Sequence, residues 1–158
     1  MITPQEKEFL EIYKHFNVIS GHGLMEQNIS ARLMHLSPPV RNKANEILKE
    51  LVNKGYIDYK PDTNFYLLTD IGEKELYGDF NFNDGLKELF EMYVHFKIAA
   101  GEGLMENNIQ AYLANNYMSP LCKKNFNDIL QYAIKNNYIT INENNFYLLT
   151  EKGEKEAY

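Results

Sequence analysis

The chain has 158 residues, of which 44% are hydrophobic and 13% aromatic, and its formal net charge is −6. This composition is typical of a folded globular protein and excludes an intrinsically disordered one. The negative charge counts against a strong nonspecific nucleic-acid binder, which is expected to be basic.

The single cysteine, Cys122, excludes a disulfide framework and a cysteine-based zinc site. No apolar run approaches the roughly 20 residues that a membrane-spanning helix needs, and the first residues lack the apolar core of a signal peptide. We therefore expect a cytoplasmic protein without a membrane partner.

The sequence contains one unit twice. Residues 9–77 recur as residues 89–158, at a spacing of 80 to 82 residues. The segment Gly-x-Gly-Leu-Met-Glu-x-Asn-Ile begins at Gly21 and again at Gly101, for example. The repeat predicts two domains, residues 1–79 and 80–158. What the two copies share reflects mainly the fold, whereas their differences can mark function.

A first helix is predicted from Pro4, because Thr3 and Glu6 can form a capping box and proline fits the first helical position. After the glycine pair, a second helix is predicted over residues 24–36. Met25 and its counterpart Met105 are expected to fill space in the core.

A third helix is predicted to begin where serine precedes proline, at Ser37 and at Ser119, since serine is a good capping residue. Its apolar residues keep a helical spacing until Gly55 in the first copy and Asn137 in the second. Both residue types tolerate the left-handed conformation that ends a helix.

Two short apolar runs follow in each copy, at residues 56–59 and 65–69 in the first, and they predict a β-hairpin. Thr69 and Thr150 are then expected to cap a short last helix. The predicted fold class is mainly α with small β-hairpins.

The pattern Leu48-x-x-Leu51-x-x-x-Gly55-Tyr56-Ile57, followed by Tyr66-x-Leu68-Thr69-x-x-Gly72, resembles the recognition helix and wing of winged-helix regulators of the MarR and PadR kind. The second copy carries the same pattern between Leu130 and Gly153. The resemblance implies two tandem winged helix-turn-helix domains. It also implies a small transcriptional or replication regulator whose third helices enter the major groove of double-stranded DNA.

The candidate DNA-binding residues lie opposite the buried stripe of each third helix and in the first hairpin. Arginine and lysine can contact phosphates or guanine, and asparagine and glutamine can read adenine. The candidates are Arg41, Asn42, Lys43, Asn45, Lys49 and Lys60 in the first copy, and Lys123, Lys124, Asn127 and Gln131 in the second. An acid on each third helix, Glu46 or Asp128, opposes phosphate binding. Since the second copy loses most of the cations, the first is expected to dominate.

Two alternatives remain open. The same side chains would also occur on solvated helix faces. The acidic charge favours a protein-interaction module, of the kind that tandem winged helices form in bacterial condensin-accessory proteins and endosomal sorting complexes. The partner is therefore either double-stranded DNA or a protein, and an oligomer is possible.

No spacing places a nucleophile beside a base or pairs two catalytic carboxylates, so we do not expect an enzyme or a cofactor. His15 and His95 recur in both copies without further ligands at metal-binding spacing, so packing is the expected role and no metal site is predicted.

Overall fold

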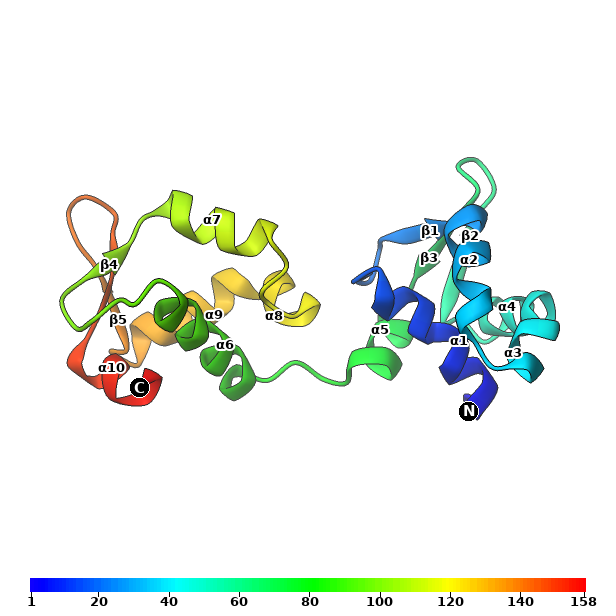
Figure 1. Ribbon diagram of the computed structural model, residues 1–158, viewed down its shortest axis with the longest axis horizontal. Coiled ribbons are helices and arrows are strands. Elements are labelled where there is room, and N and C mark those ends of the chain that lie inside the picture. The colour runs from blue at the N-terminus through cyan, green and yellow to red at the C-terminus, as the bar shows by residue number, and fades with distance from the viewer. The chain divides into compact units, whose positions relative to one another are not determined.

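The computed structural model describes residues 1–158 and divides into two compact units, Met1–Asp79 and Phe80–Tyr158 (Figure 1). The first unit contains α1 (Pro4–His15), β1 (Gly23–Met25), α2 (Glu26–Arg32), the 3₁₀ helix η1 (Leu33–His35), α3 (Pro38–Asn42), α4 (Ala44–Asn53), β2 (Ile57–Lys60), β3 (Phe65–Leu68) and α5 (Asp70–Tyr77). The second contains α6 (Phe82–His95), β4 (Gly103–Leu104), α7 (Glu106–Ala114), α8 (Pro120–Lys124), α9 (Phe126–Lys135), β5 (Ile139–Ile141), β6 (Tyr147–Leu149) and α10 (Glu151–Ala157). The fold is mainly α with two small antiparallel sheets, as predicted.

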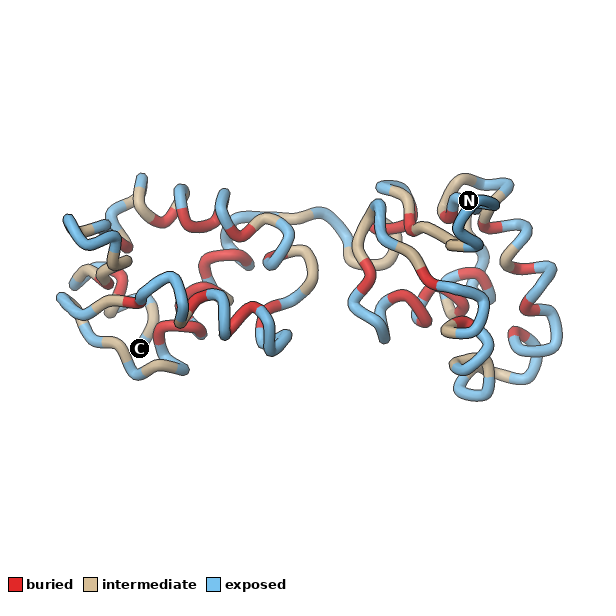
Figure 2. The backbone as a smooth tube through the Cα atoms, turned by 90° about the horizontal axis from the view of Figure 1, so that it is seen from above, coloured by how far each residue is buried: buried red, intermediate tan, exposed pale blue.

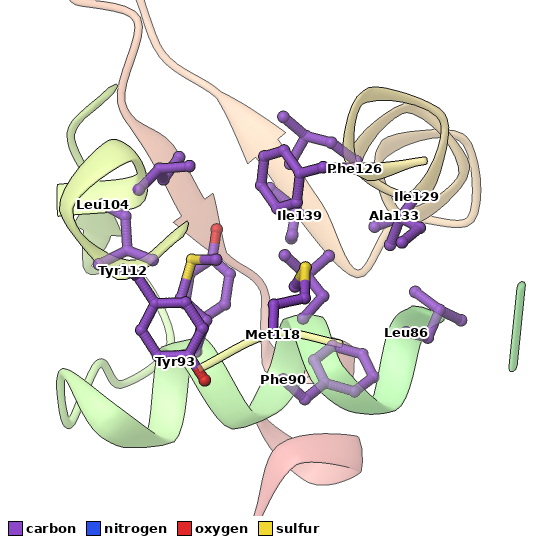
Figure 3. Packing of buried hydrophobic residues seen from close by; sticks show 14 of the residues in the cluster. Leu86, Phe90, Tyr93, Leu104, Tyr112, Met118, Phe126, Ile129, Ala133 and Ile139 are labelled. Atoms are coloured by element: carbon purple, nitrogen blue, oxygen red, sulfur yellow. The ribbon is translucent and has the colours of Figure 1, made fainter. Parts of the chain in front are cut away.

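Each unit has its own core, seen as separate sets of buried residues in Figure 2. In the second unit, side chains from α6, α7, α9 and the strands converge on one centre (Figure 3). A fully buried tyrosine recurs in both cores: the Tyr13 hydroxyl donates to the Tyr66 carbonyl oxygen at 3.1 Å, and that of Tyr93 to Tyr147 at 2.9 Å. Burial raises the pKa of both phenols. These tyrosines therefore tie the first helix of each unit to its sheet.

The predicted helix ends are confirmed where local backbone chemistry sets them. Thr3 and Glu6 form the predicted capping box at the start of α1. The hydroxyls of Thr69 and Thr150 accept hydrogen bonds from the third residues of α5 and α10. Gly55 and Asn137 both have positive φ, 77° and 60°, so glycine and asparagine serve there as the same left-handed cap.

The prediction of one helix over residues 24–36 is wrong. Its first residues form β1, which pairs with β3 so that each sheet has three strands, in the order β1-β3-β2 or β4-β6-β5. Helix α2 starts only at Glu26, because the side chain of Asn28 accepts a hydrogen bond from the backbone N–H of Met25 and caps the helix there. Met25 and Met105 are 42% and 48% exposed, which corrects their predicted place in the core.

The third helix is also divided, into α3 and α4 in the first unit and α8 and α9 in the second. The break falls at Lys43 and Asn125, whose φ and ψ of −112° and 17°, and −99° and 17°, lie in the bridge region. At Lys43 the backbone N–H bonds back three residues to Val40, as in a 3₁₀ turn. The two break residues differ in type, so the break recurs with the shared backbone path and does not require a particular side chain.

Ser37 and Ser119 do not cap the helix through their hydroxyl groups, in contrast to the prediction. Their hydroxyls donate instead to the carboxylates of Glu8 and Glu88, at 2.8 and 2.6 Å, and their backbone N–H groups donate to the same carboxylates. The serine therefore fixes the start of the third helix to the first helix.

No helix in either unit combines the length and the apolar character needed to cross a membrane.

Candidate nucleic-acid interface

The division of the third helix separates the predicted DNA-binding residues of the first unit into two groups. Arg41 and Asn42 end α3, and Lys43 forms the junction, whereas Asn45 and Lys49 belong to α4. All five side chains are exposed. The two groups lie on consecutive helical segments, so they do not form the single helix face that the sequence predicted.

A groove between α4 and the hairpin collects part of the predicted set. It has a volume of about 300 Å³ and lies over the apolar side chains of Leu48 and Val52. Its polar and aromatic lining consists of Asn45, Lys49 and Asn53 on α4 and of Tyr59 and Tyr66 on the hairpin. Arg41 and Lys43 do not line it. The groove therefore combines two amides and one cation with an aromatic surface.

The two hairpin tyrosines were not predicted as part of this surface. Tyr59 and Tyr66 are directly opposite each other in the β2–β3 pair, and their ring centroids are 4.7 Å apart. The Tyr59 hydroxyl donates to the side-chain oxygen of Asn64 at 2.9 Å, which holds the ring beside the turn. The cross-strand register was the signal that could have revealed this pair.

Lys60 is less available to a ligand than the sequence suggested. Its ammonium lies 2.6 Å from a carboxylate oxygen of Asp58 on the same strand. Both side chains are about half exposed, so the ion pair is weak, and a phosphate would compete with Asp58 for the lysine.

The electrostatic character of α4 is mixed. Lys49 is followed at once by Glu50, and Glu46 is exposed one turn before that acid. The carboxylates repel phosphate at short range, so this helix alone does not provide a strongly positive surface. Arg41 and Lys43, on the preceding segment, supply most of the positive charge near it.

The matching surface of the second unit has a different chemistry. Lys123 and Lys124 end α8, and Asn127 and Gln131 lie on α9, all exposed. Gln131 replaces Lys49, and Ile141, which is 46% exposed, replaces Tyr59. The second unit therefore keeps an amide at the first position of this face and lacks the paired tyrosines. Its cation is displaced along the helix, since Gln131 stands at the Lys49 position and Lys135 at the Asn53 position.

No three His, Cys, Asp or Glu side chains are grouped so that they could hold a metal ion. His15 and His95 are exposed, and each ring packs edge-on against the ring of the following phenylalanine, with centroids 4.9 Å apart. Comparison of the chain with protein-family models, with curated proteins and with solved structures found no match.

Proposed function

We propose that each unit is a winged helix-turn-helix domain and that the first unit binds double-stranded DNA in a small transcriptional or replication regulator. The order of a first helix, a short second helix, a two-part third helix and an antiparallel hairpin supports this. One observation carries the proposal: Asn45 and Lys49 line the same groove as the paired tyrosines of the hairpin. That surface combines the amides of Asn45 and Asn53, a cation and aromatic rings.

In this proposal α4 enters the major groove, and Asn45 and Lys49 face the base edges, where asparagine reads adenine and lysine reads guanine. Arg41 and Lys43 lie just before α4 in the chain and contact phosphates, which position the helix without reading sequence. Glu46 accepts a hydrogen bond from a cytosine amino group, the base contact typical of a carboxylate. Because few phosphates are neutralised, the affinity is modest and depends on salt.

Fluorescence anisotropy of the full chain with labelled duplexes, selected from a random library at low salt, tests the proposal. The logarithm of the affinity should fall linearly with the logarithm of the salt concentration, with a slope of about 0.9 for each phosphate contacted. Replacing Arg41 and Lys43 by alanine should weaken binding and flatten that slope. A matched double variant that removes Lys14 and Lys74, exposed lysines outside this surface, should bind like the native chain.

A protein-interaction module is the second candidate, and the exposed acids on the same surfaces favour it. Glu46 and Glu50 lie on α4, Asp128 lies on α9, and Glu143 lies in the second hairpin. A chain that retains no duplex at low salt would contradict the DNA proposal. Capture of a stoichiometric, nuclease-resistant protein on the immobilised full chain would then support the second candidate.

A further inference from the structure

A large groove is present in the second unit at a place where the first unit is almost closed. The groove has a volume of about 760 Å³ and runs along α6 beside α10. The equivalent cavity of the first unit, between α1 and α5, has about 50 Å³. All five residues that line the small cavity have aligned counterparts in the lining of the large one, so the two are the same place in the repeat.

Two differences between the units open the groove. Leu76 packs against the core of the first unit and lines its small cavity. The aligned residue of α10 is Ala157, whose side chain has three fewer carbon atoms. An ion pair of 2.6 Å between Lys7 and Glu75 also spans the small cavity. The aligned Lys87 and Glu156 line the large groove without forming an ion pair with each other.

The groove is also more apolar than its counterpart. Leu86, Phe90 and Val94 recur every four residues along α6 and line it, and Val94 is 39% exposed. The aligned residues of α1 are a glutamate, a leucine and a lysine. The second unit therefore has apolar side chains at two positions where the first has charges. Leu86 and Phe90 are largely buried, at 8% and 7% exposure, so Val94 is the exposed apolar end of the groove.

The groove offers negative charge and aromatic rings together. Glu91 of α6 and Glu156 of α10 bring two carboxylates to its lining, in which Lys87 is the one lysine. His95 of α6 and Tyr112 of α7 also line it. Tyr138 also lines it, and the ammonium of Lys152 already lies 4.3 Å from the centre of that ring. Burial raises the pKa of Tyr112, and the nearby charges of Glu91 and Glu88 raise it further, in keeping with a negative potential here.

We propose that this groove binds a small organic cation with an apolar body. The body occupies the space that the Leu76 side chain fills in the first unit, and the cationic nitrogen lies between the carboxylates of Glu91 and Glu156 with the aromatic rings beside it. The volume is within the range of about 300 to 1,000 Å³ that small-molecule sites occupy. The proposal does not depend on DNA binding.

Two probes with the same body and opposite charge, 4-phenylbutylamine and 4-phenylbutanoic acid, test the proposal by NMR titration of the full chain. The amine should shift backbone signals of α6 and α10 and leave those of α1 and α5 in place. Ala157→Leu, which installs the residue of the first unit, should weaken binding of the amine by about tenfold or more because the leucine side chain fills the site. Replacing Glu91 and Glu156 together by glutamine should weaken binding of the amine by about fivefold or more. Glu11→Gln, at the position of the first unit that aligns with Glu91, should have no effect.

Equal or tighter binding of the acid would overturn the proposal, as would the absence of a shift with either probe or shifts centred on the first unit. Unchanged amine binding in a folded Ala157→Leu variant would also overturn it. Val94→Lys installs the residue type that the first unit carries at Lys14, on an exposed position. If Ala157→Leu disturbs the fold, this variant takes its place: the added ammonium repels the amine, so binding should weaken by about tenfold or more, and unchanged binding would overturn the proposal.

Discussion

Glu6 is 4% exposed, and its carboxylate is held by partners on two sides. One oxygen lies 2.7 Å from the ammonium of Lys54, and the other accepts a hydrogen bond of 2.7 Å from the backbone of Thr3. Burial alone would raise the pKa of Glu6, but the hydrogen bonds from Lys54 and Thr3 outweigh it and hold the pKa below its ordinary value of 4.5. The second unit has Leu86 at this position, so the first unit contains a pH-dependent contact that the second lacks.

Glu6→Gln should therefore destabilise the first unit by about 1 to 2 kcal/mol at neutral pH. Because the pKa is lower in the folded state than in the unfolded state, the stabilisation is complete above about pH 4.5 and is lost as the pH falls through the folded value. Urea unfolding of the first unit, followed by its NMR signals, measures this effect. The unfolding free energies of the variant and the native chain should differ less at about pH 3 than at neutral pH. Glu11→Gln, at an exposed position, is the control. An undiminished difference in unfolding free energy between Glu6→Gln and the native chain at about pH 3 would contradict the role of the ionised Glu6 carboxylate.

At the scale of elements, the last helix of each unit packs very closely on the segment before the hairpin. A Cβ atom added to Gly72 would collide with the backbone carbonyl oxygen of Tyr56, and one added to Gly153 would collide with that of Tyr138. A backbone atom can move out of the way only if the helix shifts. Gly72→Ala and Gly153→Ala should each cost about 1 to 3 kcal/mol of unfolding free energy in thermal or urea unfolding. Lys74→Ala, on the exposed side of α5, should cost much less, and equal costs would show that close packing is not the cause.

The groove beside α4 gives a reciprocal prediction for DNA binding. Lys49→Gln gives the first unit the residue of the second, and it should lower affinity for duplex DNA by removing a contact to a guanine edge. Gln131→Lys makes the opposite exchange and should leave affinity nearly unchanged, since Ile141 stands where the first unit has a tyrosine. Anisotropy titrations of both variants provide the check. A gain from Gln131→Lys as large as the loss from Lys49→Gln would contradict an interface confined to the first unit.

The sequence predicted those elements whose causes are local. The capping box at Thr3, the left-handed caps at Gly55 and Asn137 and the hairpins depend on residues within a few positions. Strand β1 was missed because it has only three residues and its partner β3 lies about 40 residues later, so no local period reveals it. The break at Lys43 was missed because the aligned break residue, Asn125, shares no side-chain property with lysine that would mark it.

The candidate site could be predicted only in part for a similar reason. Helical spacing identified Asn45 and Lys49 as exposed on α4, but their meeting with Tyr59 and Tyr66 depends on how the hairpin packs against the helix. The sequence also contained the exchange of Leu76 for Ala157. Only the packing of α5 on α1 shows that this leucine closes a cavity.

At the scale of the whole molecule, the two units share the same backbone arrangement and differ in their surfaces. Buried tyrosines, serine–glutamate contacts and threonine caps recur in both units, and each has a structural cause. Net charge is also shared evenly: residues 1–80 carry 9 basic and 12 acidic side chains, and residues 81–158 carry 7 and 10. The units differ instead in where the charges and apolar residues lie, which favours a division of roles between them.

The most direct test compares two matched double variants of the full chain in DNA binding at several salt concentrations. One replaces Arg41 and Lys43 by alanine, and the other replaces Lys123 and Lys124, at the corresponding end of α8. We expect the first pair of substitutions to weaken binding by about tenfold or more at low salt and to flatten the salt slope by about 2. The second pair should change affinity by about twofold or less. Equal losses from the two double variants would contradict an interface on the first unit and would indicate that both units read DNA.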